Sequence, residues 1–249
     1  MNSTQSFAVV IPARFKSSRF PGKPLVDICG KPMIQHVWER CCKAVGPELV
    51  YVATDDEGIQ DVVESFGGQV VMTSSECLTG TDRLAEANQA LDKDFIVNVQ
   101  GDEPLINPDD IKKVISVFQK TGNVTNAMCA ITSEEEFRSF TVPKVTFSTS
   151  GKLLYMSRSG IPLTKYGEYS FGYKQVCIYA FSKKQLAFFY SNAAKTKHEE
   201  VEDIEILRFL ESDFQVDMVE VEAGSLAVDV PDDVQAVIDR MNSESQFRG

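Results

Sequence analysis

Short apolar runs alternate with helical patterns through the first hundred residues. The runs predicted as strands are residues 7–11, 49–53, 70–72 and 95–99, and those predicted as helices are 33–45, 58–66 and 81–91. The strand runs are almost uninterrupted by polar residues, which is typical of parallel strands that are buried on both faces. Strands alternating with helices at this spacing predict a layered α/β fold with a mostly parallel sheet.

The second half of the chain has a less regular pattern. A hairpin is predicted over 142–147 and 152–157, with its turn at Ser150 and Gly151. The remaining predicted strands are 176–181, 215–221 and a short one ending at 231, and the remaining helices are 182–190, 202–211 and 232–241. No repeat or linker rich in Pro, Gly or Ser interrupts the sequence. We therefore expect a single domain over 1–249, with a partly antiparallel lobe inserted at about 135–200.

Charge and composition exclude several classes of protein. The 249 residues carry 36 acidic against 25 basic side chains, a formal net charge of -11. A surface this acidic disfavours nucleic acid and anionic membranes as partners. No apolar stretch reaches the roughly 18 residues of a membrane helix, and the polar start of the chain is unlike a secretory signal. Six scattered cysteines without a Cys-x-x-Cys pair favour reduced thiols in the cytoplasm over zinc or disulfides.

A basic loop follows the first predicted strand. It carries four cations within ten residues: Arg14, Lys16, Arg19 and Lys23. Ligands of parallel α/β sheets bind beyond the carboxyl ends of the strands, and Arg and Lys suit phosphate oxygens. Prolines at 12, 21 and 24 stiffen the segment. We interpret the loop as a phosphate-binding segment in preference to a solvated basic loop.

Two aspartates follow predicted strands and suggest a metal site. Asp102 follows Gly101 after the strand at 95–99, and Asp229 precedes Val230 and Pro231. Mg²⁺ takes oxygen ligands and needs only one or two carboxylates when substrate phosphates supply the rest. Either aspartate alone is more simply a turn or helix cap. Together with the basic loop, the pair favours a magnesium site.

Several motifs together resemble the 3-deoxy-manno-octulosonate (KDO) cytidylyltransferases. They are Val-Ile-Pro-Ala-Arg-Phe at 10–15, Ser-Arg-Phe-Pro-Gly-Lys-Pro-Leu at 18–25, Thr-Gly-Thr-Asp-Arg-Leu-Ala-Glu at 79–86, Val-Asn-Val-Gln-Gly-Asp-Glu-Pro at 97–104, Tyr-Met-Ser-Arg-Ser-Gly-Ile-Pro at 155–162 and Val-Asp-Val-Pro-Asp-Asp at 228–233. The likeness runs nearly end to end. It implies the three-layer α/β/α fold of nucleotide-diphospho-sugar transferases and a homodimer paired by the smaller lobe.

The resemblance also implies a reaction and the residues that carry it. CMP would pass from CTP to the anomeric hydroxyl of an acidic octulosonate, releasing pyrophosphate, for lipopolysaccharide biosynthesis. No nucleic acid or membrane would take part. Implied catalytic residues are Arg14, Lys23, Asp102 and Asp229, with Mg held by the two aspartates. The nucleotide would lie against Pro12, Ala13, Arg14, Arg19, Lys23, Arg83 and Asp102, and the sugar near Gln100, Arg158, Gln175, Tyr179, Glu202 and Asp203.

The chain departs from the family pattern on the sugar side. Gln175 stands where the family has a His, and residues 202–211 replace the family's Glu-His-Ile-Glu-x-Leu-Glu-Gln-Leu-Arg, so that Asp203 replaces a His and Phe209 a Gln. A carboxylate gained beside the sugar suits an ammonium. The resulting hypothesis is that the sugar is 8-amino-3,8-dideoxy-manno-octulosonate. The alternative explanation of these differences is neutral change at the rim of the pocket. Alternatives are a synthetase for sialic-acid-like nonulosonates and a non-catalytic nucleotide-binding paralogue.

Overall fold

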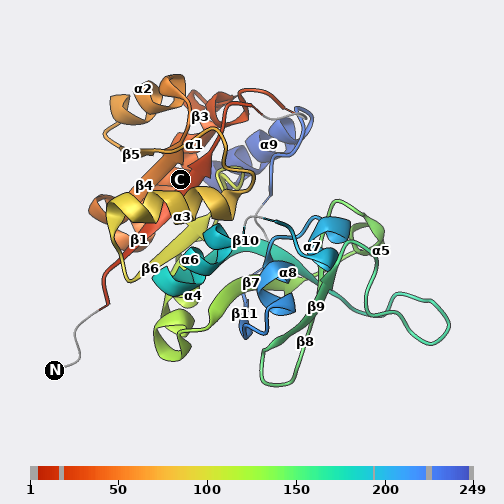
Figure 1. Cartoon of the computed structure of the whole chain (residues 1–249). Coiled ribbons are helices and arrows are strands. Elements are labelled where there is room, and N and C mark those ends of the chain that lie inside the picture. The colour runs from red at the N-terminus through yellow and green to blue at the C-terminus, as the bar shows by residue number, and fades with distance from the viewer. Residues whose placement is uncertain (1–4, 17–19, 193, 223–225, 247–249) are drawn as a thin grey trace.

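One central sheet with helices on both faces forms the body of the molecule (Figure 1). The computed structural model describes residues 5–16, 20–192, 194–222 and 226–246. The strands are β1 (Phe7–Ala13), β2 (Asp27–Ile28), β3 (Lys31–Pro32), β4 (Val50–Thr54), β5 (Gln69–Met72), β6 (Phe95–Val99), β7 (Val124–Ala130), β8 (Lys144–Phe147), β9 (Leu153–Ser157), β10 (Tyr173–Ser182) and β11 (Val216–Glu220). The helices are α1 (Met33–Val45), α2 (Glu57–Ser65), α3 (Gly80–Leu91), α4 (Pro108–Thr121), α5 (Glu134–Arg138), α6 (Lys183–Ser191), α7 (Lys197–Glu202), α8 (Ile206–Glu211) and α9 (Asp233–Gln246), with short 3₁₀ turns at Lys23–Leu25 and Pro47–Leu49.

The strand order places three polar loops at one edge of the sheet. The order is β11-β7-β10-β6-β1-β4-β5. All neighbours in it are parallel except β10, which runs antiparallel between β6 and β7. The carboxyl ends of β1, β4 and β6 therefore lie at the same edge of the sheet. The predicted phosphate-binding loop follows β1, Asp55 follows β4, and Asp102 lies in the loop after β6. The predicted α/β fold with a mostly parallel sheet is confirmed.

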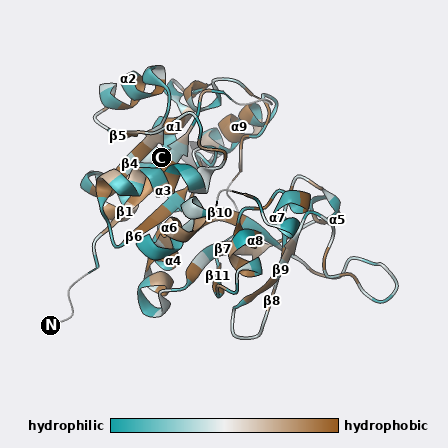
Figure 2. Ribbon diagram, viewed as in Figure 1, coloured by the Kyte–Doolittle hydropathy of each residue, from teal (hydrophilic) through white to brown (hydrophobic). Residues whose placement is uncertain are grey.

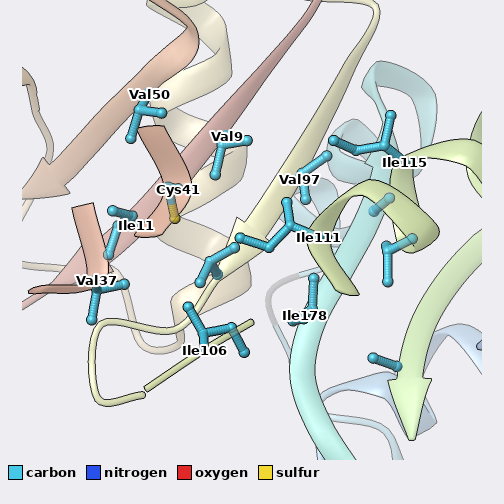
Figure 3. Packing of buried hydrophobic residues seen from close by; sticks show 14 of the residues in the cluster. Val9, Ile11, Val37, Cys41, Val50, Val97, Ile106, Ile111, Ile115 and Ile178 are labelled. Atoms are coloured by element: carbon cyan, nitrogen blue, oxygen red, sulfur yellow. The ribbon is translucent and has the colours of Figure 1, made fainter. Parts of the chain in front are cut away.

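Strand residues alternate between two apolar cores. Val9 and Ile11 of β1 face α1, α2 and α4, whereas Ala8 and Val10 face α3, α6 and α8. Figure 3 shows the first of these cores, with Val9 and Ile11 lying near Cys41 of α1. Both faces are thus covered, which is why the strands read as continuous apolar runs. The hydropathy colouring shows the same division, with brown strands inside and teal on the outer faces of the helices (Figure 2).

Helix boundaries follow capping signals in the sequence. The Asp56 side chain accepts a hydrogen bond from the Ile59 N–H at the start of α2, and Thr79 and Asp82 form a reciprocal capping box at the start of α3. Helix α4 starts after Asn107 and ends at Gly122, whose φ of 67° is left-handed.

The smaller lobe extends the sheet on one side. Strand β8 pairs antiparallel with β10 and β9, and the loop between β9 and β10 projects away from the body (Figure 1). The predicted hairpin at 142–157 is therefore present. In the described part of the chain, no helix has the length and apolar character needed to cross a membrane. The six cysteines are all free.

Three predictions about elements are wrong or incomplete. No element was predicted over 104–141, where α4, β7 and α5 lie. The helix expected over 202–211 is two short helices, because Asp203 adopts a left-handed φ of 51° between α7 and α8. Asp229 ends no strand and lies on the loop before α9. The neighbouring Val228 side chain packs instead in a third apolar cluster with Met33 and Val237.

Candidate active site

A polar cleft opens at the carboxyl ends of β1 and β6. Its volume is about 280 Å³, and its walls come from the loop after β1, the start of α3, the loop after β6 and the segment around α7. Arg19 lies outside the described residues. The other residues predicted to bind nucleotide all line the cleft: Pro12, Ala13, Arg14, Lys23, Arg83 and Asp102.

Lys23 is the centre of the polar contacts in this region. Its ammonium donates to Oδ2 of Asp102 at 2.8 Å and to the Val228 carbonyl at 2.8 Å. It also lies 3.9 Å from Oδ1 of Asp229. Two carboxylates from distant parts of the chain therefore face one positive charge. Asp102 and Asp229 thus approach the same ammonium, although Asp102 lines the cleft and Asp229 lines a neighbouring pocket. The magnesium site stays a prediction.

Backbone contacts hold the loops that carry these groups. The Val228 N–H donates to the Asp102 carbonyl at 2.9 Å, which ties the loop before α9 to the loop after β6. Gly101 lies so close to β1 that a Cβ atom there would be 3.1 Å from the Pro12 carbonyl oxygen. Gly22, with a φ of 71°, turns the chain into the 3₁₀ segment that begins at Lys23. The aspartate and lysine are therefore placed by backbone as well as by charge.

The first turn of α3 faces the cleft and contains Arg83. The guanidinium of Arg83 donates to Thr73 Oγ1 at 2.5 Å and lies 3.2 Å from Asp55 Oδ1. The side chain is almost fully buried, so its charge is fixed in position. The Arg83 guanidinium, although paired with Asp55, is a cation that this end of the cleft can offer to a phosphate.

A second set of charges comes from the segment around α7. Lys195 lies 2.6 Å from Oδ1 of Asp203. Glu205 accepts a hydrogen bond from the Thr81 N–H at 3.0 Å. Burial raises the pKa of the Glu205 carboxyl, and the bonds from Thr81 only partly oppose this. This wall can therefore accept hydrogen bonds from hydroxyls and can hold a cation.

Only some of the residues predicted to bind the sugar line the cleft. Gln100 and Asp203 line it, whereas Arg158, Gln175, Tyr179 and Glu202 are not among its lining residues. Arg158 donates through Nε to the Glu202 carbonyl at 2.6 Å and through Nη2 to the Asp203 carbonyl at 2.9 Å. Arg158 and Glu202 thus support the segment that carries Asp203.

Gln175 supports the sheet beneath the cleft. Its amide donates to Asn126 Oδ1 at 3.0 Å and to the Met156 sulfur at 3.4 Å. The amide of Asn126, which is fully buried, donates in turn to the carbonyls of Val176 and Ile178, at a bulge in β10. Tyr179, half-buried after this bulge, has its pKa raised well above the usual value by burial.

Glu103 is a residue of this region that the sequence analysis missed. Its side chain is buried, and its Oε1 accepts the Cys177 N–H at 3.1 Å, while the Cys177 carbonyl accepts the Gln100 N–H at 3.2 Å. The loop that contains Asp102 is therefore fastened to β10 on both sides. Its place in the family-like motif at 97–104, beside Asp102, was the available signal for Glu103. Nothing local in the sequence indicated Lys195 or Glu205 as wall residues.

Comparisons with known proteins agree with this geometry. Residues 8–218 match the family model described as Cytidylyltransferase. A protein of Hydrogenovibrio crunogenus named 3-deoxy-manno-octulosonate cytidylyltransferase 2 is 44% identical over 245 residues, covering 94% of this chain and 98% of that protein. One of Shewanella piezotolerans named 8-amino-3,8-dideoxy-manno-octulosonate cytidylyltransferase is 42% identical over 233 residues, covering 91% and 95%.

A solved structure is similar over the whole fold. It is described as CMP:2-keto-3-deoxy-manno-octonic acid synthetase complexed with CTP, and superposes with a TM-score of 0.89 at 38% identity. The alignment covers 96% of this chain and 99% of that one. Both the cleft and the smaller lobe therefore lie within the shared architecture.

Proposed function

The chain belongs to the cytidylyltransferase family, and we propose that it transfers CMP from CTP to the anomeric hydroxyl of an acidic octulosonate sugar, releasing pyrophosphate. The observation that carries this proposal is the meeting of Lys23, Asp102 and Asp229 beside a cleft that also contains Arg14 and Arg83. Fixed cations on one side suit a triphosphate, and carboxylates on the other suit a divalent cation.

Mg²⁺ is the metal that these residues fit. Asp102 and Asp229 supply hard oxygen donors from two loops, and the Val228 carbonyl lies beside them. Among the described residues, no group of three or more His, Cys, Asp or Glu side chains could hold a metal alone. A pair of carboxylates completed by substrate phosphates is the arrangement that Mg²⁺ accepts. When bound, the ion would neutralise phosphate charge and lower the pKa of the attacking hydroxyl.

The chain's own residues supply position and charge for the transfer. The anomeric oxygen of the sugar would attack the α-phosphorus of CTP in line, forming a P–O bond as the bond to pyrophosphate breaks and the hydroxyl proton is lost. Such transfers depend mainly on orientation and electrostatic stabilisation. Lys23, Arg14 and Arg83 would bind the phosphate oxygens, while Gln100 and Glu205 would orient sugar hydroxyls. The cleft thiol, Cys77, has its pKa raised to about 12 by burial and by Glu86, so it is a poor nucleophile.

A product analysis tests the proposed reaction. The purified chain is incubated with CTP, Mg²⁺ and a panel of acidic sugars: KDO, its 8-amino analogue and a nine-carbon nonulosonate. Mass spectrometry should detect a CMP-octulosonate with matching pyrophosphate release. CMP transfer to the nonulosonate alone, or no product from any sugar, would overturn the proposal.

We propose further that the 8-amino sugar is preferred over plain KDO. The Asp203 carboxylate lies on the cleft wall and could receive an ammonium in a charge-assisted hydrogen bond. Relatives named for either sugar have nearly equal identity to this chain, 44% and 42%. The ratio of kcat/KM values for the two sugars decides the question, and equal or better use of plain KDO contradicts the preference.

The smaller lobe supports a proposal of a homodimer. Several large apolar side chains are exposed there, including Phe140 at 70%, Tyr166 at 75% and Phe171 at 58%. Large exposed apolar side chains on one lobe are candidates for a protein interface. Light scattering should give twice the mass of the chain, and Tyr166→Lys with Phe171→Glu should give monomers.

The free cysteines support a reducing compartment such as the cytoplasm.

A further inference from the structure

Helix α7 is too short to be stable alone, yet it carries one wall of the cleft. It spans the six residues Lys197–Glu202, and an isolated helix of this length is not stable in water. Asp203 caps it in a left-handed conformation and lines the cleft. The position of this wall must therefore be set by contacts between α7 and its neighbours.

A buried ion pair joins α7 to α8. Arg208 donates through Nε to Oε2 of Glu199 at 2.7 Å and through Nη2 to Oε1 at 2.6 Å. Both side chains are 1% exposed. The guanidinium also lies 3.6 Å from the ring centre of Phe189 and donates through Nη1 to the Asn192 carbonyl at 3.0 Å. A bidentate pair with stacking fixes both distance and orientation.

The Glu211 carboxylate of α8 holds the start of α7. Glu211 accepts hydrogen bonds from the N–H of His198 at 3.0 Å and of Glu199 at 3.2 Å, and from the Thr196 hydroxyl at 2.5 Å. Amides in the first turn of a helix have no acceptor within the helix itself, and Glu211 supplies that acceptor here. Helix α7 is thus held to α8 at both its first turn and its buried face.

The far end of α7 transmits its position to the cleft. Oε2 of Glu202 accepts the Arg158 N–H at 2.8 Å and its Oε1 accepts the Ser157 hydroxyl at 2.7 Å, which joins α7 to the end of β9. The next residue is Asp203, whose carboxylate pairs with Lys195. A shift of Glu199 would therefore move the cleft residues on both sides of α7.

The charge of residue 208 determines whether its buried contact with Glu199 is attractive or repulsive. A carboxylate there would face Glu199 with a like charge in a site closed to solvent, whereas the arginine makes the pair attractive. Since like charges without solvent repel strongly, the identity of residue 208 is coupled to that of residue 199.

We propose that the Arg208–Glu199 ion pair is a positioning device for the sugar end of the cleft, acting through α7 on Asp203 and Lys195. This inference rests on the proposed function, because it assumes that the sugar lies against that wall. Neither residue touches the cleft, so both act through others. The pair governs recognition of the sugar and leaves the nucleotide end unaffected.

Kinetics of the intact 249-residue chain test this role. The double variant Glu199→Gln/Arg208→Met removes both charges, while the new amide oxygen at position 199 can still accept the Thr196 N–H that Glu199 accepts now. Removing both partners of a buried pair is much less disruptive than removing one. The sugar KM should rise between about 10-fold and 100-fold through loss of alignment, with the CTP KM changed less than about twofold. Arg208→Lys, which keeps the charge but not the bidentate contact, should give an intermediate sugar KM.

The controls separate positioning from stability. Lys183→Met removes the exposed ion pair with Asp92, beyond the end of α3 that lies away from the cleft, and should change neither KM. A double variant that is folded by circular dichroism but has an unchanged sugar KM, or has both KM values raised equally, overturns the inference. Absence of CMP-sugar from the wild-type enzyme would instead overturn the proposed function, so the two failures are distinguishable.

Discussion

The Lys23 ammonium lies 2.8 Å from the Asp102 carboxylate, so a basic loop and an acidic loop that are 79 residues apart meet at one point. A charge-assisted contact of this kind holds both loops ready for ligands of opposite sign. Asp229 approaches the same ammonium from a third loop. The arrangement places the groups proposed to bind phosphate and metal in contact before any substrate enters.

The first prediction concerns the two aspartates. Asp102→Asn and Asp229→Asn should each lower kcat by about 100-fold or more, because a neutral amide cannot hold the divalent cation that stabilises charge in the transition state. The CTP KM should change less, since Lys23 and Arg83 remain. Pyrophosphate release measured over a range of Mg²⁺ concentrations should show a raised requirement for the metal, and EDTA should abolish wild-type activity reversibly.

A matched substitution controls for loss of negative charge. Asp109→Asn on the exposed surface of α4 removes the same charge away from the cleft and should leave kcat unchanged. Wild-type rates in Asp102→Asn or in Asp229→Asn would exclude that aspartate as a metal ligand.

The second prediction concerns Asp203 and its partner Lys195. The hydrogen bond from Lys195 ties up the carboxylate and raises the pKa of the lysine. Lys195→Met should remove one cationic partner of Asp203, with Arg158 Nη2 remaining 4.0 Å from its Oδ2. The preference for the 8-amino sugar over KDO should then rise by about tenfold, equivalent to about 1.4 kcal/mol. Asp203→Asn should lower that preference by a similar factor.

The ratio of kcat/KM values for the two sugars measures this effect. Lys184→Met, an exposed lysine of α6, is the control and should leave the ratio as in the wild type. If neither cleft variant changes the ratio, Asp203 does not recognise the amine.

The third prediction concerns Glu103. Glu103→Ala leaves the Cys177 N–H without its acceptor, which should cost about 1–3 kcal/mol of unfolding free energy. The loop of Asp102 would also lose an anchor, so kcat should fall by about tenfold. Glu103→Gln keeps an acceptor oxygen and should retain most of both quantities. Urea denaturation and initial rates measure the two effects, and equal behaviour of the two variants would contradict the anchoring role.

The arrangement of the residues predicted to bind nucleotide follows from the sequence more directly than that of the residues predicted to bind the sugar. Arg14, Lys23 and Asp102 follow buried strands, and the geometry of a parallel sheet brings the carboxyl ends of such strands together without further information. Strand geometry does not place Asp229, because this residue ends no strand. Its position depends on the packing of Val228 in one apolar cluster with Met33. Only the family resemblance pointed to it strongly.

Long-range contacts explain the errors on the sugar side. Helical spacing continues through 202–211, but Asp203 takes a left-handed conformation because α7 is fixed by Glu199 and Arg158. No local pattern encodes such contacts. The sugar role of Gln175 stays a prediction, but its hydrogen bonds to Asn126 and Met156 could not be foreseen, because only the paired strands bring these partners within reach.

The last prediction concerns pH and Glu211. Desolvation raises the pKa of this carboxyl, but hydrogen bonds from Thr196 and His198 outweigh it and lower the pKa to about 2, from 4.5. A carboxylate with a lowered pKa stabilises the folded state above its unfolded pKa and loses that contribution as pH falls toward the folded value. At pH 7, Glu211→Gln should therefore lower the free energy of unfolding by about 1–2 kcal/mol, less than the full shift implies because the group is near the surface. In urea titrations, the difference in unfolding free energy between the wild type and Glu211→Gln should become smaller as the pH falls from about 5 to about 2. Glu134→Gln, at the exposed Arg138 pair, should show almost no gap at any pH. A Glu211→Gln gap that is constant with pH would show that the charge of Glu211 does not stabilise α7.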